Sequence, residues 1–459
     1  MKNRWTQQDA RDAVDRWGNA HGEAFALRLY SARLLGEDPD LVLHGGGNVS
    51  LKGTHRTVFG DEVDALFVKA SGRDLATLDP RDLPALDLAC LQRLCNLDAL
   101  GDDDMVNELR THLFDASAPT PSIEALVHAI IPHAYVDHSH ADAVLAVTNH
   151  VGGDELAREA MGDRVAVLPY VRPGFELAKA VADCVKTNSE IDGIVLLHHG
   201  LITFGQDAET AYERHIELVD ACERLIAKHF TASRQSTVPR GVRREGEVDK
   251  RAEQVAPLLR GLLAMPTGDE DHPYRRSIME WRTSEELLAL ISTQDAPRLA
   301  AAGALTGDHI IRTKAKPLYV ADPNWSDGDK LREQLRTHID EYRKEYTAYV
   351  EAHGGCATGL DPSPRVVVLP GAGLFCWGIS KREALVTADI AEHTLITKAK
   401  SDAIGPSRQF VGECLKRKLC VSDQGERCRI NFVYVQFADV DVDDRLGGGP
   451  RYSVTESAG

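Results

Sequence analysis

The segment AYVDHSHADAV, residues 134–144, is the stretch that most narrows the choice of fold and chemistry. Its alternating apolar residues are typical of a buried β-strand. Because residues two apart on a strand point to the same face, His138 and His140 can both reach one cation. A His-x-His pair alone is more often packed or solvent-facing, but two basic rings within an apolar strand favour a metal site.

Two segments outside this strand offer further ligands. Glu124 lies in TPSIE, residues 120–124, at the start of a predicted helix over 122–131, where a carboxylate also favours the helix dipole. That helix ends a few residues before the His-x-His strand, so Glu124 can lie close to the same cation. His198 and His199 end an apolar strand, and one of them is a candidate third imidazole ligand. The other is then a core histidine.

Two glycine-rich turns offer groups that suit a phosphate. GGGNVS, residues 45–50, has backbone N–H groups, the amide of Asn48 and the hydroxyl of Ser50, and KASGR, residues 69–73, adds more donors after a strand. Such arrangements bind anions, although single glycine-rich turns are mostly structural. The Asn48 segment also matches the glycosylation pattern, which we discount because the chain shows no secretion signal.

Strand and helix patterns alternate through the N-terminal half of the chain. Helices are expected over 9–35, 81–97, 122–131 and 207–229, strands over 65–69, 134–147 and 191–197, and a turn over 41–51. This mixture predicts a layered α/β domain over residues 1–230. A polar, arginine-containing stretch then predicts a linker over 231–247.

The remaining residues predict an accessory lobe over 248–405. Helical patterns dominate 248–303 and 328–352, with a strand expected over 309–313 and a loop over 354–364. Residues 406–459 continue none of the earlier patterns, and we expect an irregular tail there.

An internal repeat links the two lobes. IVLLHHGLITFG, residues 194–205, aligns without gaps with VVLPGAGLFCWG, residues 367–378, and a helix is expected at the same offset after each, with Asp207 and Ser380 as N-caps. Chance similarity of two strand–turn–helix units is the alternative. If the repeat is real, the second copy has Gly371 and Ala372 in place of two histidines, so it can keep the fold without binding metal.

Composition excludes several classes of function. The 459 residues carry 53 basic and 70 acidic side chains, a net charge of −17, which disfavours binding to nucleic acid or an acidic membrane. No run of 18 apolar residues and no secretory signal is present, and the nine scattered cysteines match no zinc pattern. We therefore expect a cytoplasmic protein with reduced thiols.

Taken together, GNVS (47–50), ASG (70–72), PSIE (121–124), HSH (138–140) and HHG (198–200) resemble the class II aldolase/adducin family, in the family's order. The resemblance covers residues 20–230 and implies an α/β/α layered catalytic domain. It also implies zinc, or another divalent cation, on three histidine ligands, a catalytic carboxylate, a tyrosine acid and a phosphate site. The implied residues are, in that order, His138, His140 and His199; Glu124; Tyr170; and Gly47, Asn48, Ser71, Gly72 and Ser122.

The resemblance further implies an activity. Residues 270–405 resemble the middle of long fused proteins in which a rhamnulose-phosphate-type aldolase half precedes a short-chain dehydrogenase half. We therefore expect retro-aldol cleavage of a ketose 1-phosphate by a homo-oligomer. A dehydrogenase half with its GxGxxG turn is not found, so oxidoreductase activity is not predicted. Epimerisation or dehydration at the same zinc site and a non-catalytic, adducin-like scaffold are the alternatives.

Overall fold

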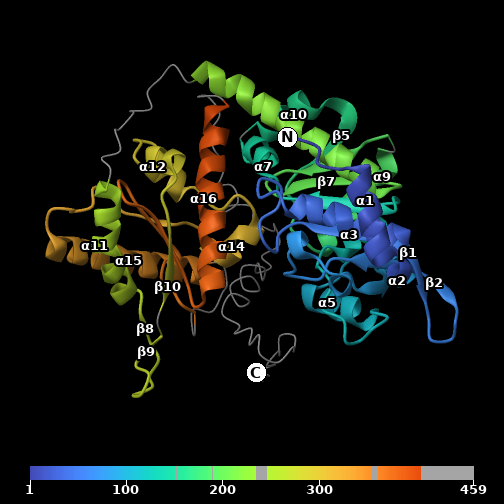
Figure 1. The fold of residues 1–459 in the computed structure, drawn as a ribbon, viewed down its shortest axis with the longest axis horizontal. Coiled ribbons are helices and arrows are strands. Elements are labelled where there is room, and N and C mark those ends of the chain that lie inside the picture. The colour runs from blue at the N-terminus through green and yellow to red at the C-terminus, as the bar shows by residue number, and fades with distance from the viewer. Residues whose placement is uncertain (151, 189, 234–245, 276, 353–359, 405–459) are drawn as a thin grey trace.

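The chain folds into two lobes that lie side by side in a computed structural model (Figure 1). The structure describes residues 1–459 except 151, 189, 234–245, 276, 353–359 and 405–459, so the predicted tail and most of the predicted linker lie outside the described residues. The last described helix, α16 (Lys381–Ala403), belongs to the second lobe and contacts α7 and α10 of the first.

The first lobe is built on one mixed sheet. Within the described residues, seven strands pair in the order β3-β2-β1-β4-β7-β6-β5, and β5–β6 is the parallel pair. The strands are β1 (Asn48–Arg56), β2 (Glu62–Val68), β3 (Ala85–Asp87), β4 (Tyr135–Ser139), β5 (Val165–Leu168), β6 (Gly193–Leu196) and β7 (Gly200–Gly205). The His-x-His strand, β4, is therefore central and has a neighbour on each side.

Helices cover both faces of this sheet because its strands alternate apolar side chains between the faces. One face packs on α3, α7, α8 and α10, and the other packs on α4, α5, α6 and α9. The described helices of this lobe are α1 (Gln7–Ala13), α2 (Asn19–His21), α3 (Glu23–Gly36), α4 (Leu88–Leu94), α5 (Asp102–Thr111), α6 (Ala125–Ile130), α7 (Asp142–Thr148), α8 (Gly153–Met161), α9 (Phe175–Thr187) and α10 (Ala208–Ser233). The predicted layered α/β fold is confirmed.

The second lobe has a smaller sheet of the same kind. Four described strands pair in the order β10-β13-β12-β11, with α11 and α15 packed on one face and α12 and α16 on the other. The elements are α11 (Glu247–Leu262), β8 (Met265–Pro266), β9 (Tyr274–Arg275), β10 (Ile278–Arg282), α12 (Glu285–Ile291), α13 (Ala296–Ala301), α14 (Gly307–Thr313), β11 (Leu318–Tyr319), α15 (Gly328–Ala352), β12 (Val366–Leu369) and β13 (Gly373–Gly378).

The two halves of the predicted repeat have the same register. β6 pairs with β7 from Gly193↔Thr203 to Leu196↔Gly200, and β12 pairs with β13 from Val366↔Cys376 to Leu369↔Gly373. The order β4-β7-β6-β5 is matched by β10-β13-β12-β11, with the same parallel and antiparallel pairings. Asp207 and Ser380 accept a backbone N–H three residues on, as predicted for N-caps.

The second copy lacks the imidazoles of the first. Trp281 pairs with Phe375 where His138 pairs with Ile202, and Ala372 takes the turn position of His199. The Trp281 indole Nε1 donates to the Ala372 carbonyl oxygen at 2.7 Å. The positions of His138 and His199, whose rings are neighbours in the first copy, are thus joined by a direct hydrogen bond in the second.

Several predicted elements are correct in place and type. Helices 122–131, 207–229 and 328–352 correspond to α6, α10 and α15, and strands 65–69 and 191–197 correspond to β2 and β6. The predicted domain boundary at residue 230 lies inside α10, and α11 begins at the end of the predicted linker.

Other predicted elements are wrong, because tertiary pairing overrides local pattern. The helix over 9–35 is broken at Gly22, whose φ is 88°, after a π-helical turn. The turn over 41–51 gives way to a strand at Asn48, which pairs with β4. The helix over 81–97 contains β3, and the strand over 134–147 ends at Ser139, before α7.

Two corrections concern the second lobe. The β-branched segment HIIRT, residues 309–313, predicts a strand, but it lies in α14, where His309 and Thr313 are buried one helical turn apart. The largely helical region 248–303 also contains β10, which pairs with β13 at the edge of the second sheet.

Candidate metal centre

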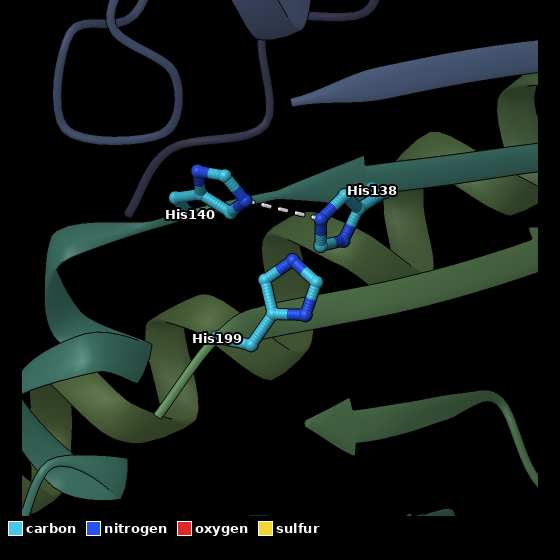
Figure 2. A group of neighbouring side chains, drawn as sticks. All are labelled: His138, His140 and His199. Carbon is cyan, nitrogen blue, oxygen red and sulfur yellow. Dashed lines mark hydrogen bonds between the residues drawn. The ribbon is translucent and has the colours of Figure 1, made fainter. Parts of the chain in front are cut away.

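Three imidazoles converge at the ends of inner strands of the first sheet (Figure 2). Their ligand atoms all lie within 4.8 Å of one another, and His138 Nε2 lies 3.2 Å from His140 Nε2. His138 lies on β4 and His140 directly after it, whereas His199 lies in the turn between β6 and β7. The sequence-predicted histidines are therefore brought together, and their role as ligands stays a prediction.

The backbone explains why His199 and not His198 joins this cluster. His198 has a φ of 61°, in the left-handed region, which closes the tight turn between β6 and β7. Its Nδ1 lies 3.4 Å from Asn149 Oδ1, whereas His199 is buried beside His138 and His140. Gly371 has a φ of 77° at the corresponding turn of the second copy, so both hairpins use the same turn geometry.

A hydrogen bond holds one of the rings with Nε2 toward the centre, and a carboxylate lies beside the outer nitrogen of a second ring. His138 Nδ1 faces the Leu201 carbonyl oxygen at 3.0 Å, and His140 Nδ1 faces Asp308 Oδ2 at 3.3 Å. The Leu201 carbonyl favours the His138 tautomer with the proton on Nδ1, which leaves its Nε2 lone pair for a metal ion. Burial lowers the pKa of His138 to about 3, so this ring is neutral, the form that binds metal.

Glu124 completes the donor set. Its Oε1 lies 3.3 Å from His199 Nε2 and 3.5 Å from His138 Nε2. Burial would raise the pKa of this carboxyl, but the three neighbouring imidazoles and the hydrogen bond with His199 hold it well below its usual range. An ionised carboxylate beside three imidazole nitrogens is a donor set that fits zinc or a similar divalent cation.

The glycine-rich turn lies directly beside these ligands. Asn48, the first residue of β1, pairs with His138 of β4 and is fully buried. Its Oδ1 accepts from the Val49 N–H, but among the described residues its Nδ2 has no hydrogen-bond partner. A buried amide donor without a partner costs about 1–3 kcal/mol, so this group favours a ligand at the site. Gly47 has a φ of 64°, and a Cβ there would meet the His138 carbonyl oxygen at 2.8 Å.

The other predicted phosphate residues lie on neighbouring turns. Ser71 and Gly72 are exposed after β2, and the Ser71 N–H donates to the Thr120 carbonyl, which joins this turn to the segment of Ser122. The Ser122 hydroxyl accepts from the Glu124 N–H at 3.3 Å. Tyr170 is half-buried in the segment after β5, and its role stays a prediction.

The sequence did not predict the burial of one charged group at this site, Lys69, or the presence of another, Asp308. The Lys69 ammonium is buried and donates to the Gly45 and Arg73 carbonyl oxygens, each at 2.8 Å. Burial lowers the pKa of Lys69 to about 8, against the pull of carboxylates that include Asp308 and Glu124. Asp308 comes from the second lobe, and no sequence spacing indicated its approach to His140.

Comparisons with known proteins identify the fold of the first lobe as a class II aldolase domain. Residues 28–226 match the family profile described as "Class II Aldolase and Adducin N-terminal domain", and residues 250–410 match "Aldolase class II, second domain". The chain therefore carries two successive domains of the class II aldolase/adducin family.

A curated relative matches most of this chain but is a longer protein. The chain is 30% identical over 394 residues to "Uncharacterized oxidoreductase YuxG" of Bacillus subtilis (strain 168); this match covers 83% of the chain and 54% of the relative. The chain thus spans about half the length of that curated relative. The predicted link to rhamnulose-phosphate aldolase/dehydrogenase proteins is not shown by these comparisons and stays a prediction.

Solved structures also resemble the first lobe. An N-terminal class II aldolase domain from Thermoplasma acidophilum is 39% identical, with a TM-score of 0.44, covering 49% of this chain and 99% of that one. L-fuculose-1-phosphate aldolase from Thermus thermophilus is 20% identical, with a TM-score of 0.30, covering 45% and 98%. Among the described helices, none has the length and apolar character needed to cross a membrane.

Proposed function

We propose that this protein is a zinc-dependent aldolase that cleaves a ketose 1-phosphate, similar to rhamnulose 1-phosphate, into dihydroxyacetone phosphate and a small aldehyde. The observation that carries the proposal is the convergence of His138, His140, His199 and Glu124, with ligand atoms of the histidines within 4.8 Å of one another. Membership of two domains in the class II aldolase family supports it.

The three histidines and Glu124 would hold the metal ion. When bound, a divalent cation supplies Lewis-acid polarisation of the substrate carbonyl, which favours cleavage of the C3–C4 bond. The hydrogen bond to the Leu201 carbonyl keeps the His138 Nε2 directed at the ion position, and the Asp308 carboxylate lies 3.3 Å from the outer nitrogen of His140.

Glu124 would move the proton. It is ionised and buried, and its Oε1 lies beside the ion position defined by His138 and His199. On cleavage the C4 hydroxyl loses its proton as the aldehyde forms, and C3 of the other fragment gains one. We assign both transfers to Glu124: its carboxylate would accept the proton that leaves the C4 oxygen and then deliver it to C3, so that the group ends ionised as it began, while the Tyr170 hydroxyl would donate a hydrogen bond to the C4 oxygen.

The turns beside the metal centre would bind the phosphate. The unpartnered Nδ2 of Asn48, the backbone of Gly47 and Gly72, and the hydroxyls of Ser71 and Ser122 are donors of the right kind. The phosphate lies away from the reacting bond, so its binding energy can orient the substrate. The buried Lys69 adds a positive charge behind the same turn.

Metal content and turnover together test this proposal. We expect the purified protein to bind one divalent ion per chain, and His138→Ala and His199→Ala to lose most of it. Glu124→Gln keeps an oxygen donor but not the proton, so it should lower turnover by about 100-fold or more while metal content falls little. Glu176→Gln, on the exposed side of α9, is the matched control and should change neither.

Product analysis separates the alternatives. Release of dihydroxyacetone phosphate and aldehyde from a ketose 1-phosphate supports the aldolase. Formation of an isomer or a dehydrated product from the same compound would instead assign an epimerase or dehydratase. A purified protein without metal would favour a non-catalytic, adducin-like scaffold. The predicted homo-oligomer is tested by the mass of the protein in solution.

A further inference from the structure

Helix α14 is the part of the second lobe that reaches the metal centre, and it has no counterpart in the first lobe. In the first copy only a short turn, Gly162–Arg164, separates α8 from β5. In the second copy α13 ends at Ala301 and β11 begins at Leu318, with α14 (Gly307–Thr313) between them. The insertion is therefore specific to the copy that lacks its own histidines.

Asp308 is the residue of α14 that faces the cluster. Its Oδ2 lies 3.3 Å from His140 Nδ1, on the side of the ring opposite the nitrogen that faces His138. A Cβ added to Gly46 would lie 2.9 Å from the same Asp308 oxygen, so the absence of a side chain in the glycine-rich turn lets the carboxylate approach. The buried Lys69 contributes a positive charge to the electrostatic environment of Asp308.

The position of α14 does not depend on Asp308. The Leu305 carbonyl accepts from Asn149 Nδ2 at 3.0 Å, and the Leu305 side chain packs on Leu145 of the first lobe. His309 and Thr313 are buried against the second lobe, where His309 Nδ1 lies 3.4 Å from Thr394 Oγ1 on α16. Residues on both sides of Asp308 therefore hold the helix in place. The Asp308 carboxylate is not needed for this packing and can interact with His140.

We propose that Asp308 is a positioning residue for the metal centre, supplied by the second lobe, which orients His140 and raises its strength as a ligand through the contact at Nδ1. This inference rests on the proposed function only in that the three histidines bind a divalent ion. Carboxylates in this relation to a metal-binding histidine fix the tautomer and ring orientation, and their loss typically costs about 10–100-fold in metal affinity. The second lobe is then part of the active site.

The test is a double-mutant cycle on metal affinity. Apparent zinc affinity is measured by competition with a chelator for the full chain, Asp308→Asn, His140→Ala and the double variant. We expect Asp308→Asn to weaken zinc binding about 10–100-fold. In the His140→Ala background the same change should have little further effect, because Asp308 acts through that ring. Asp329→Asn, at the exposed start of α15, is the matched control and should bind zinc like the wild type.

A spectroscopic signature adds a second readout. With cobalt in place of zinc, Asp308→Asn should shift the visible absorption bands, whereas Asp329→Asn should not. Unchanged zinc affinity and cobalt spectrum in Asp308→Asn would overturn the inference, as would equal losses in both His140 backgrounds. If Asp308→Asn fails to fold, Asp308→Ser is put through the same cycle with the same expected result. A wild-type chain that binds no zinc or cobalt contradicts the proposed function itself, which is a distinguishable failure.

Discussion

At the scale of single residues, the buried ion pair Arg28–Asp137 attaches the His-x-His strand, β4, to helix α3. Arg28 Nη2 lies 2.6 Å from Asp137 Oδ1, and both side chains are fully buried. Burial raises the pKa of the Asp137 carboxyl, and Arg28 on α3 opposes that rise. Asp137 directly precedes His138, so this pair holds the backbone of the first ligand.

Removing Arg28 should therefore be costly. Arg28→Met leaves Asp137 buried without its cation, and we expect the free energy of unfolding to fall by about 3–5 kcal/mol in denaturant titration. Arg28→Met combined with Asp137→Leu removes both charges and should recover much of that loss. A single variant as stable as the wild type would show that the pair does not hold this strand.

Residue patterns predicted the site residues that the first lobe contributes, but not the contact that comes from the second lobe. His138 and His140 follow from strand alternation, and the positions of Glu124 and His199 follow from the family resemblance. Asp308 could not be found, because it directly precedes a segment predicted as a strand and reaches the site only when the two lobes pack together. Lys69 was seen only as a donor near a glycine turn, since sequence does not indicate its burial.

At the scale of elements, the β6–β7 hairpin delivers His199, and Gly200 permits its close pairing. A Cβ at Gly200 would lie 2.2 Å from the Ser139 carbonyl oxygen and 3.0 Å from the His138 ring. The first contact is with the backbone of β4. This strand is paired on both sides, so it can move away only at a high cost in free energy. The glycine is thus a condition for the metal centre as well as for the hairpin.

We expect Gly200→Ala to destabilise the protein by about 1–3 kcal/mol, the usual cost of overpacking, and to weaken metal binding. Thermal unfolding and metal content measure the two effects. Gly261→Ala is the matched control, because no atom lies within 4 Å of a Cβ there and the residue is in α11. An alanine in that helix should add about 0.5–1 kcal/mol of stability. Equal behaviour of the two variants would contradict the crowding at Gly200.

Element prediction from the sequence succeeded where the helical period was long and failed at short strands. α10 and α15 are long amphipathic helices, and their spacing alone indicates them. β3 and β10 are short, and pairing with β2 and β13 defines them. The internal repeat was detectable because the strand–turn–helix unit of β6, β7 and α10 kept its spacing in the second copy, whereas the inserted α14 left no comparable pattern.

At the scale of the whole molecule, α16 fastens the second lobe to the first through histidine–carboxylate pairs. His393 Nδ1 lies 2.7 Å from Asp142 Oδ2 on α7 and 3.8 Å from Asp40 Oδ1. Nearby, His44 Nε2 lies 3.0 Å from Asp389 Oδ2. Asp308 approaches His140 from the second lobe, so these contacts between the lobes would also support the proposed role of Asp308.

The pair at His393 should make lobe packing depend on pH. Burial alone would lower the pKa of His393, but the hydrogen bond to Asp142 and the charges of Asp142, Asp40 and Glu392 raise it above 6.5 overall. A raised pKa means that the contact contributes fully below pH 6.5 and is lost as the pH rises through the folded value.

We expect the unfolding temperature to fall over this alkaline range in the wild type. His393→Gln, which can still donate a hydrogen bond but does not titrate, should flatten that part of the profile and cost about 1–3 kcal/mol at low pH. His272→Gln, which removes an exposed histidine beside Asp269, is the control and should keep the wild-type profile. A His393→Gln profile parallel to that of the wild type would assign the pH dependence to other groups.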